Sequence, residues 1–314
     1  MTRRIHTIDC EYLGRPKVAA AYLVEDAKRA AFVDNNTVHA VPLMLDALKA
    51  VGLSTEQVEL LIITHVHLDH AGGTAELLRH CPNARVVAHP RAARHVIDPG
   101  KLVASASAVY GDEQFRELYG EIRPIPESRV QTMEDGETLP FGDGELLFLH
   151  TRGHANHHFC VHDPATASMF TGDAFGLVYP ALQTEGTFAL PSTTPTDFDG
   201  PAARAAIRRI IDMGAERLFP THFGEVRSIE AAAAQLIRHL HFAEDLVAEA
   251  VDGGQPDEAL QAYCEYRLRD YLQGFLDGHG TLGQDPDTWK FLEMDIELNA
   301  QGLAFAARRQ RARE

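Results

Sequence analysis

One stretch of ten residues carries side chains that could bind a metal ion. Thr64–Gly73 reads THVHLDHAGG and holds three imidazoles and a carboxylate within six residues. It follows Glu59–Ile63, an apolar and β-branched run that predicts a buried strand. The ligands would therefore lie at the carboxyl end of a strand, where Gly72-Gly73 lets the chain turn. Nitrogen and oxygen ligands at this density suit zinc or a similar transition metal.

A surface loop that is rich in histidine by chance is the alternative interpretation of this stretch. A single His-x-His pair such as His65 and His67 is common in proteins that bind no metal. Asp69 and His70 follow the pair within three residues, and they favour the metal site.

Three further motifs, each after a strand-like apolar run, supply more ligands of the same types. They are TRGH ending at His154, TGD ending at Asp173 and PTH ending at His222. Together with the first loop they make the ordered motif pattern of the metallo-β-lactamase superfamily, which the sequence resembles from about Tyr22 to Glu225.

The resemblance implies seven metal ligands, all imidazoles or carboxylates. They are His65, His67 and His154 for a first metal ion, Asp69, His70 and His222 for a second, and Asp173 as the bridge between the two ions. Two divalent ions are therefore expected, with zinc favoured and iron or manganese as alternatives that imidazole ligands do not exclude. We expect Asp69 and Asp173 to be the catalytic residues.

The resemblance also implies the fold, a four-layer αββα sandwich of the α/β class with the site at one edge of the paired sheets. We expect this domain to span residues 1–227. Beyond it the composition shifts to helix formers, and residues 228–251, 256–276 and 286–311 predict three long helices. We therefore predict a C-terminal helical extension over residues 228–314, whose apolar stripes pack against the sandwich or against a second subunit in a homodimer.

Length, charge and cysteine content set broader bounds. The chain has 314 residues, 45% of them hydrophobic, which is enough for one large core with an appendage. A net charge of −16 disfavours a nucleic-acid partner. We expect a cytoplasmic protein without a membrane partner, because no apolar run has membrane-spanning length and the first residues are too polar for a signal peptide. Four scattered cysteines without C-x-x-C spacing predict reduced packing residues.

Two positions near the predicted ligands each admit two interpretations. Asp34 matches the residue that supports the metal loop in the superfamily, although Asn35–Thr37 stands where Thr and Gly usually follow. Asp34 could equally cap a helix that begins at Val38. His157, which precedes His158, is either an outer hydrogen-bond partner or proton shuttle of the site, or a structural residue before the next strand.

Residues 174–199 form a long irregular segment directly after Asp173, and long loops beside a site are usually functional. Phe175, Tyr179 and Phe188 are therefore predicted to wall a substrate pocket. Tyr179 could also donate a hydrogen bond to a developing oxyanion, with packing as its alternative role. Apolar and aromatic walls favour a small acyl substrate over a polyanion.

The predicted metal centre indicates hydrolysis. Two cations held by neutral imidazoles and carboxylates lower the pKa of a bridging water to about 7. We expect a dinuclear metal-dependent hydrolase that uses a metal-bridging hydroxide on a small ester, thioester or lactone, favoured over a phosphodiester because of the acidic charge. The alternative within the same fold is a non-haem iron protein, either persulfide dioxygenase-like or an oxygen-binding diiron sensor.

Within the superfamily the sequence resembles a bacterial and archaeal branch more than the well-studied hydrolases. Secreted β-lactamases of this fold commonly have Cys at the position of Asp173 and carry an export signal, and we expect neither here. Hydroxyacylglutathione hydrolases share the ligand set, but the C-terminal region offers no convincing basic site for a thiol cofactor. Flavodiiron relatives usually have Glu at the position of His67, which favours zinc in this chain.

Overall fold

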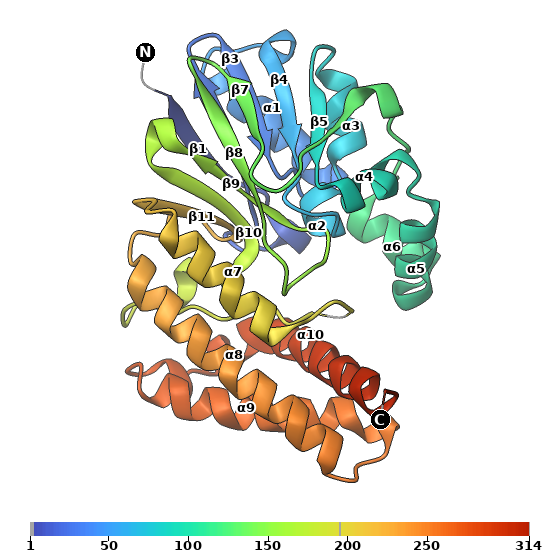
Figure 1. Ribbon diagram of the computed structural model, residues 1–314, viewed down its shortest axis with the longest axis vertical. Helices are drawn as coiled ribbons and strands as arrows, with labels where there is room; N and C mark the ends of the chain where they lie inside the picture. The colour runs from blue at the N-terminus through green and yellow to red at the C-terminus, as the bar shows by residue number, and fades with distance from the viewer. Residues whose placement is uncertain (1–2, 195, 314) are drawn as a thin grey trace. The chain divides into compact units, whose positions relative to one another are not determined.

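The computed structural model describes residues 3–194 and 196–313, without the side chains of Val109 and Tyr110. The chain forms two compact units (Figure 1). The first comprises Met1–His150, His157–Gly172 and Met213–Arg227, and the second Thr151–Asn156, Asp173–Asp212 and Ser228–Glu314. The domain boundary predicted at residue 227 coincides with one of the breaks between these units.

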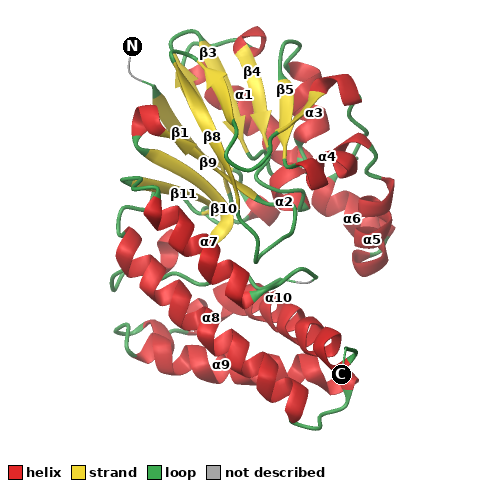
Figure 2. Cartoon of the chain, in the orientation of Figure 1, coloured by secondary structure: helices red, strands yellow, loops and turns green. Residues whose placement is uncertain are grey.

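Two β-sheets build the first unit (Figure 2). One has the order β1 (Arg4–Asp9), β2 (Ala20–Asp26), β3 (Arg29–Val33), β4 (Val58–Ile62), β5 (Arg85–Ala88), β6 (Val130–Thr132). The other has the order β11 (Arg217–His222), β10 (Ser168–Leu177), β9 (Phe159–Asp163), β8 (Gly144–His150), β7 (Thr138–Phe141). The last residues of β10 belong to the second unit.

Strand direction decides where the ligand loops emerge. β3, β4, β5 and β6 pair in parallel, whereas β1 and β2 add to β3 in antiparallel pairs. Parallel neighbours end at the same edge of a sheet. The loop that follows β3 at Asp34 therefore lies beside the loop that follows β4 at Thr64.

Aromatic side chains fill the space between the two sheets. Tyr22 of β2 packs against Phe170 of β10 and Phe219 of β11, with ring centroids 5.4 and 5.3 Å apart. Phe148 of β8 packs edge-on against Phe159 of β9 at 5.0 Å. Large rings bury much apolar surface per residue, so this layer holds the sheets face to face.

Helices cover the outer face of the six-stranded sheet. The packing helices are α1 (Val41–Ala50), α3 (Thr74–His80) and α4 (Pro90–Ile97). Two further helices, α5 (Gly100–Tyr110) and α6 (Asp112–Tyr119), follow α4. A helical layer and two sheets thus account for three of the four predicted layers within the first unit.

The second unit is mainly helical. Its long helices are α7 (Gly200–Asp212), α8 (Ile229–Asp252), α9 (Leu260–Asp277) and α10 (Pro286–Arg311). α8 packs against α7 and α10, and α10 packs against α9 (Figure 1). The three predicted C-terminal helices are confirmed, although α9 begins four residues later than expected because residues 257–259 form a short 3-10 turn.

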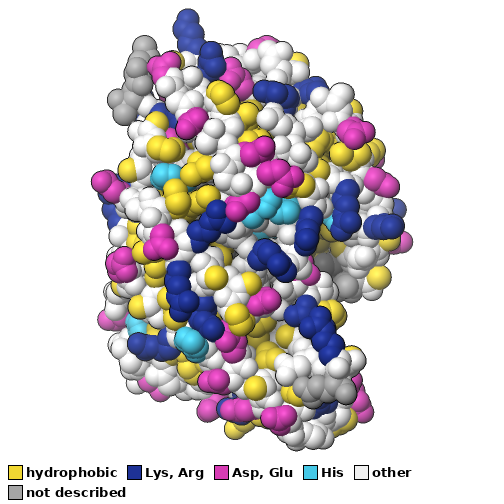
Figure 3. Space-filling view, viewed as in Figure 1, with side chains coloured by type: hydrophobic (Ala, Val, Ile, Leu, Met, Phe, Trp, Pro, Cys, Tyr) yellow, Lys and Arg dark blue, Asp and Glu magenta, His cyan; other side chains and the backbone are white. Residues whose placement is uncertain are grey.

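The described residues can be compared with the predictions about membrane spanning, surface charge and cysteine state. Among the described residues, no helix combines the length and the apolar character that spanning a bilayer requires. Figure 3 shows Lys and Arg side chains interspersed with Asp and Glu on the face drawn. All four cysteines are buried thiols, as predicted. Burial raises the pKa of Cys81 to about 12 and that of Cys264 to about 11, so both stay protonated.

A buried arginine links the two sheets. Arg3 donates from Nε and Nη2 to Asp26 Oδ2 at 3.0 Å each, and from Nη1 to Asp163 Oδ1 at 2.5 Å. Asp26 ends β2 in one sheet and Asp163 ends β9 in the other. Because both carboxylates are at most 4% exposed, the guanidinium neutralises two charges that water hardly reaches.

We expect Arg3→Met to lower the free energy of unfolding by about 3–5 kcal/mol, because it leaves two buried carboxylates without a counter-charge. Chemical denaturation followed by circular dichroism measures this change. Arg4→Met is the matched control, since Arg4 is the adjacent and exposed arginine. Equal unfolding free energies for the two variants would contradict the role of Arg3.

A buried histidine lies inside the second unit. His239 of α8 is 3% exposed, and its Nδ1 lies 2.9 Å from the hydroxyl of Tyr271. Its ring packs edge-on against Phe275 at 4.5 Å. Burial, reinforced by the positive charge of Arg238 and His279, lowers the pKa of His239 to about 3. The imidazole is therefore neutral in the folded protein at any ordinary pH.

Stability should consequently fall as the pH drops below about 6.5, the pKa of a histidine in an unfolded chain. Below pH 6.5 His239 binds a proton in the unfolded state, whereas in the folded state it binds one only near pH 3. Between these two values the free energy of unfolding falls by about 1.4 kcal/mol per pH unit. Above pH ~6.5 His239 is neutral in both states, so it causes no loss of folding stability there. Denaturation curves between pH 7 and 4.5 test this, with His239→Gln expected to reduce the slope and the exposed His241→Gln expected to keep it. A slope unchanged in His239→Gln would refute the assignment.

Candidate metal centre

Two glycines let the ligand loop fold back on its neighbour. The loop leaves β4, forms the short helix α2 (Leu68–Ala71) and continues into α3. A Cβ on Gly72 would lie 2.5 Å from the carbonyl oxygen of Leu68, and one on Gly73 would lie 2.7 Å from that of Thr37. Any side chain at either position would clash with the backbone, so only glycine fits here.

The loop after β3 is hydrogen-bonded to β4 and to the ligand loop. Asp34 donates its N–H to the carbonyl of Ile62, and Gly73 donates its N–H to that of Asn36, both at 2.8 Å. The Asn36 side chain donates to the Asp69 carbonyl at 2.9 Å. Asn36 has a φ of 54°, a left-handed conformation that Asn tolerates better than most residues. The turn therefore forms without the glycine that is usual in the superfamily.

Asp34 is the hub of this arrangement and is 1% exposed. Its carboxylate accepts from the N–H of Thr64 at 2.8 Å, from Nδ1 of His70 at 2.8 Å and from the hydroxyl of Thr221 at 2.6 Å. Thr37, not Asp34, caps the helical turn that follows. The cap interpretation of Asp34 is therefore wrong, and the supporting role is the one that the contacts describe.

One group of predicted ligands converges within the first unit. Ligand atoms of Asp69, His70 and His222 all lie within 4.8 Å of one another. Nε2 of His70 is 3.6 Å and Nε2 of His222 is 3.3 Å from Asp69 Oδ2. In the same rings Nδ1 faces an acceptor, the Asp34 carboxylate at 2.8 Å and the Val18 carbonyl at 2.9 Å. Each Nδ1 thus carries the proton, and each Nε2 directs a lone pair to the Asp69 side.

This donor set fits a divalent metal ion. Two imidazole lone pairs and one carboxylate oxygen are ligands that zinc and iron accept alike. The acceptors behind the two rings fix their tautomer and orientation, as such partners do in known metal sites. The described His and Asp groups therefore support metal binding.

His65 and His67 form a second pair in the first unit. Nε2 of His65 lies 2.8 Å from Nδ1 of His67, and Nδ1 of His65 lies 3.3 Å from the hydroxyl of Thr64. Two ring nitrogens this close either share one proton or face a common cation. His65 is fully buried, and two imidazole nitrogens held this close together suit a shared metal ion.

The remaining two predicted ligands meet in the second unit. Nε2 of His154 lies 3.5 Å from Asp173 Oδ2, while its Nδ1 lies 3.2 Å from the carbonyl oxygen of Ser192. This repeats the arrangement of a ring held at Nδ1 with Nε2 turned toward a carboxylate. A Cβ on Gly153 would lie 2.3 Å from the backbone of Ala203, so the chain before His154 rests directly on α7. One centre formed by all seven ligands stays a prediction.

His157 and His158 both border predicted ligands in the first unit. The ring of His157 stacks on His65 at 6.0 Å and meets His67 edge-on at 5.5 Å. His158 is fully buried with its ring 5.0 Å from His65. These neighbours support the interpretation of His157 as an outer partner of the site.

Two histidines that the sequence did not connect with this region also lie nearby. His95 of α4 meets His157 with ring centroids 6.3 Å apart. His89 accepts from the N–H of Arg91 at 3.0 Å and so caps α4, while burial and the neighbouring His150 lower its pKa to about 3. No spacing signal links α4 to the ligand loop, because their proximity arises from tertiary packing, in which α4 lies against β6.

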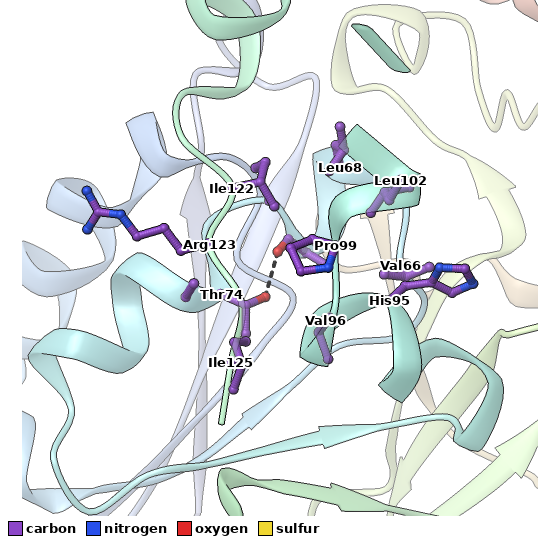
Figure 4. A pocket seen from close by; sticks show the side chains of 13 residues that line it. Val66, Leu68, Thr74, His95, Val96, Pro99, Leu102, Ile122, Arg123 and Ile125 are labelled. Atoms are coloured by element: carbon purple, nitrogen blue, oxygen red, sulfur yellow. Dashed lines mark hydrogen bonds between the residues drawn. The ribbon is translucent and has the colours of Figure 1, made fainter. Parts of the chain in front are cut away.

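An apolar pocket lies behind the ligand loop in the first unit, and Figure 4 draws its lining. Val66 and Leu68 of the loop face Val96 of α4 and Leu102 of α5 there. Thr74 closes its hydrogen bond to the Ala71 carbonyl at 2.6 Å beside them. The cavity volume is about 10 Å³, roughly the room of one water molecule. These side chains therefore brace the ligand loop from behind.

The predicted aromatic pocket walls have other contacts. Tyr179 donates its hydroxyl to Asp295 at 3.0 Å, and the ring of Phe188 lies 5.9 Å from that of Phe275. Phe175 is fully buried. A small pocket of the second unit that contains His154 and Asp173 is lined by none of these three aromatic residues. Their role in substrate binding stays a prediction.

Comparison with known proteins decides the family. The family model of the metallo-beta-lactamase superfamily matches residues 14–222, a range that includes all seven predicted ligands. The chain belongs to the metallo-β-lactamase superfamily. The resemblance seen in the sequence is thereby confirmed.

Solved structures show the fold of this superfamily member. The metallo-beta-lactamase fold-containing protein ST1585 of Sulfurisphaera tokodaii is 24% identical over 273 residues, which cover 85% of this chain and 95% of that protein. The crystal structure of ST1585 matches with a TM-score of 0.65 at 20% identity, over 96% of this chain and 99% of that chain. A metallo-beta-lactamase family protein from Thermus thermophilus matches with a TM-score of 0.64 at 20% identity, over 98% and 93%. The predicted αββα sandwich with C-terminal helices is confirmed.

A relative with a named activity matches a shorter part of the chain. Acyl-coenzyme A thioesterase MBLAC2 of Bos taurus is 28% identical over 170 residues. The match covers 52% of this chain and 56% of that protein, so the chain spans about half the length of this relative.

We expect Asp34→Asn to weaken metal binding about 10–100-fold, because an amide cannot hold the proton of His70 Nδ1 as a carboxylate does. Chelator competition measures the affinity, and circular dichroism checks the fold. Asp46→Asn on the exposed side of α1 is the control, since it removes a carboxylate far from any predicted ligand. The same affinity in both variants would show that Asp34 does not tune the ligands.

Proposed function

We propose that the chain is a metal-dependent hydrolase that cleaves a small acyl ester or thioester. The observation that carries this proposal is the group of Asp69, His70 and His222, in which both imidazoles are held at Nδ1 and turn Nε2 toward the Asp69 carboxylate. A loop that was only rich in histidine would have no reason to hold both rings in the metal-binding tautomer.

We further propose that His65, His67, His154 and Asp173 complete a dinuclear centre with this group. The order of the motifs along the chain and the family membership support it. Chain continuity supports it as well, because Asp173 directly follows Gly172 of the first unit. Zinc is our proposed metal and the cytoplasm our proposed location.

Bound divalent ions would supply Lewis acidity and a water of lowered pKa, about 7 in single-zinc precedents. The residues of this chain do the rest. Asp34 keeps His70 oriented and its Nδ1 protonated. Asp69, with Oδ2 3.3 Å from Nε2 of His222, can accept and orient a water proton at that oxygen. Buried His65 and His154 exclude bulk water from their sides of the ligand set.

The substrate class follows from charge and from the relatives. A chain with a net charge of −16 repels polyanions, which disfavours phosphodiesters. MBLAC2 is named an acyl-coenzyme A thioesterase, which supports an acyl thioester as the substrate here. Thioesters also suit a carboxylate and imidazole site because the thiolate leaves readily without a dedicated acid.

Elemental analysis of protein purified without added metal, combined with thioester assays, tests the proposal. We expect about two zinc ions per chain and hydrolysis that chelation removes and zinc restores. Asp173→Ala should abolish turnover with an unchanged circular dichroism spectrum, whereas Asp212→Ala, which removes an exposed carboxylate of α7, should not.

Two results would count against this function. Hydrolysis that persists in Asp173→Ala would remove the bridging role of that carboxylate. Iron in place of zinc, together with oxygen consumption and no hydrolysis, would favour the non-haem iron alternative.

A further inference from the structure

We propose that a small apolar pocket in the second unit receives the acyl group of the substrate and restricts it to acetyl and similarly short groups. This acyl pocket, which contains His154 and Asp173, rests on the proposed function, since it presumes that an acyl group is presented to those ligands. It specifies which acyl groups are accepted.

The acyl pocket combines two predicted ligands with a lining that is apolar apart from Ser192 and Arg152. Beside His154 and Asp173 lie residues of α7, of α8 and of the segments around Gly176 and Pro191. The only other charged lining residue is Arg152, which is exposed and donates to Asn156 at 3.0 Å. A carbonyl carbon held at the ligands would therefore leave the aliphatic side chains of α7 and α8 for the chain attached to it.

Small residues create the room in this pocket. Ala203 and Ala206 line it from α7, and Gly176 lines it from β10. Gly176 has a φ of 67°, and a Cβ there would lie 2.7 Å from Cδ2 of Leu236. Gly176 therefore lets the backbone of β10 approach Leu236 closely, and the room in the pocket comes from Ala203 and Ala206.

Large aliphatic residues limit the same pocket. Ile207 of α7 and Leu236 and Leu240 of α8 line it, and each is at most 1% exposed. The cavity volume is about 10 Å³, roughly the room of one water molecule. A methyl group is close to a water molecule in size, whereas a longer chain must displace a packed leucine or isoleucine. The dimensions therefore select an acetyl group.

A larger pocket in the second unit does not suit an acyl chain. Its cavity volume is about 330 Å³, but its lining includes Arg309, Arg313, Asp199 and Glu244. Burying an alkyl chain against four charged groups would desolvate them without compensation. The acyl pocket is thus the better site for an apolar group.

The test compares p-nitrophenyl acetate, butyrate and hexanoate as substrates of the zinc-loaded protein. Wild type should prefer acetate, with kcat/KM falling at least about tenfold by butyrate. Leu240→Ala removes three carbon atoms and so makes room for the two methylenes by which butyrate exceeds acetate. Because each buried methylene is worth about fourfold, the butyrate-to-acetate ratio of kcat/KM should rise about 16-fold. Leu272→Ala is the control, because Leu272 is an equally buried leucine of α9 outside the pocket.

A filling variant covers the case in which Leu240→Ala does not fold. Ala206→Val adds two methyl groups to the pocket and should lower the ratio of kcat/KM for p-nitrophenyl acetate to kcat/KM for p-nitrophenyl formate. Acyl preferences in both pocket variants that match wild type and Leu272→Ala would overturn the inference, while hydrolysis itself would still support the proposed function.

Methyl NMR separates the two proposals if no ester is hydrolysed. Sodium acetate added to the zinc-loaded protein should shift the methyl resonances of Leu236 and Leu240 and leave those of Leu272 in place. Sodium butyrate should produce a shift only in the Leu240→Ala variant, at the remaining Leu236. Methyl resonances that do not respond to acetate would refute the acyl pocket, whatever the fate of the hydrolase proposal.

Discussion

A single buried carboxylate determines how the first unit is assembled around its ligands. Asp34 is buried, and a buried carboxylate is very costly unless several hydrogen-bond donors surround it. Its donors are Thr64 after β4, His70 in the ligand loop and Thr221 in β11. These residues come from both sheets, so satisfying one carboxylate fixes the ends of strands that are distant in sequence and orients a ligand ring at the same time.

Much of this arrangement could be predicted from the sequence, and the reason is strand direction. An apolar run before Thr64 and another before Asp34 predict two strands, and parallel pairing brings their ends together. The geometry of the turn at Asn36 could not be predicted. Its left-handed backbone depends on a contact with the Asp69 carbonyl that exists only once the loops have met. Likewise no local pattern pairs Arg3 with Asp163, which lie 160 positions apart.

The lining of the second-unit pocket was harder to anticipate. Composition directs attention to large aromatic residues such as Phe188 and Tyr179, yet these residues gain most free energy by full burial in a packed core. A pocket exists where side chains are missing. Alanine makes that space, and in a sequence Ala206 resembles any other small residue. Tertiary packing alone distinguishes a small residue that leaves room from one that fills a tight contact.

The anchored rings of His70, His222 and His154 have a consequence for how this protein acquires its metal. Each ring is held at Nδ1 by protein atoms, so its orientation does not depend on the ion. Folding then does not require the ion, in contrast to zinc fingers, which are unfolded without their metal. A metal-free protein of this kind can remain folded, and the bound protein can exchange one divalent cation for another. The metal it carries in the cell is therefore decided by supply and by relative affinity rather than by the act of folding.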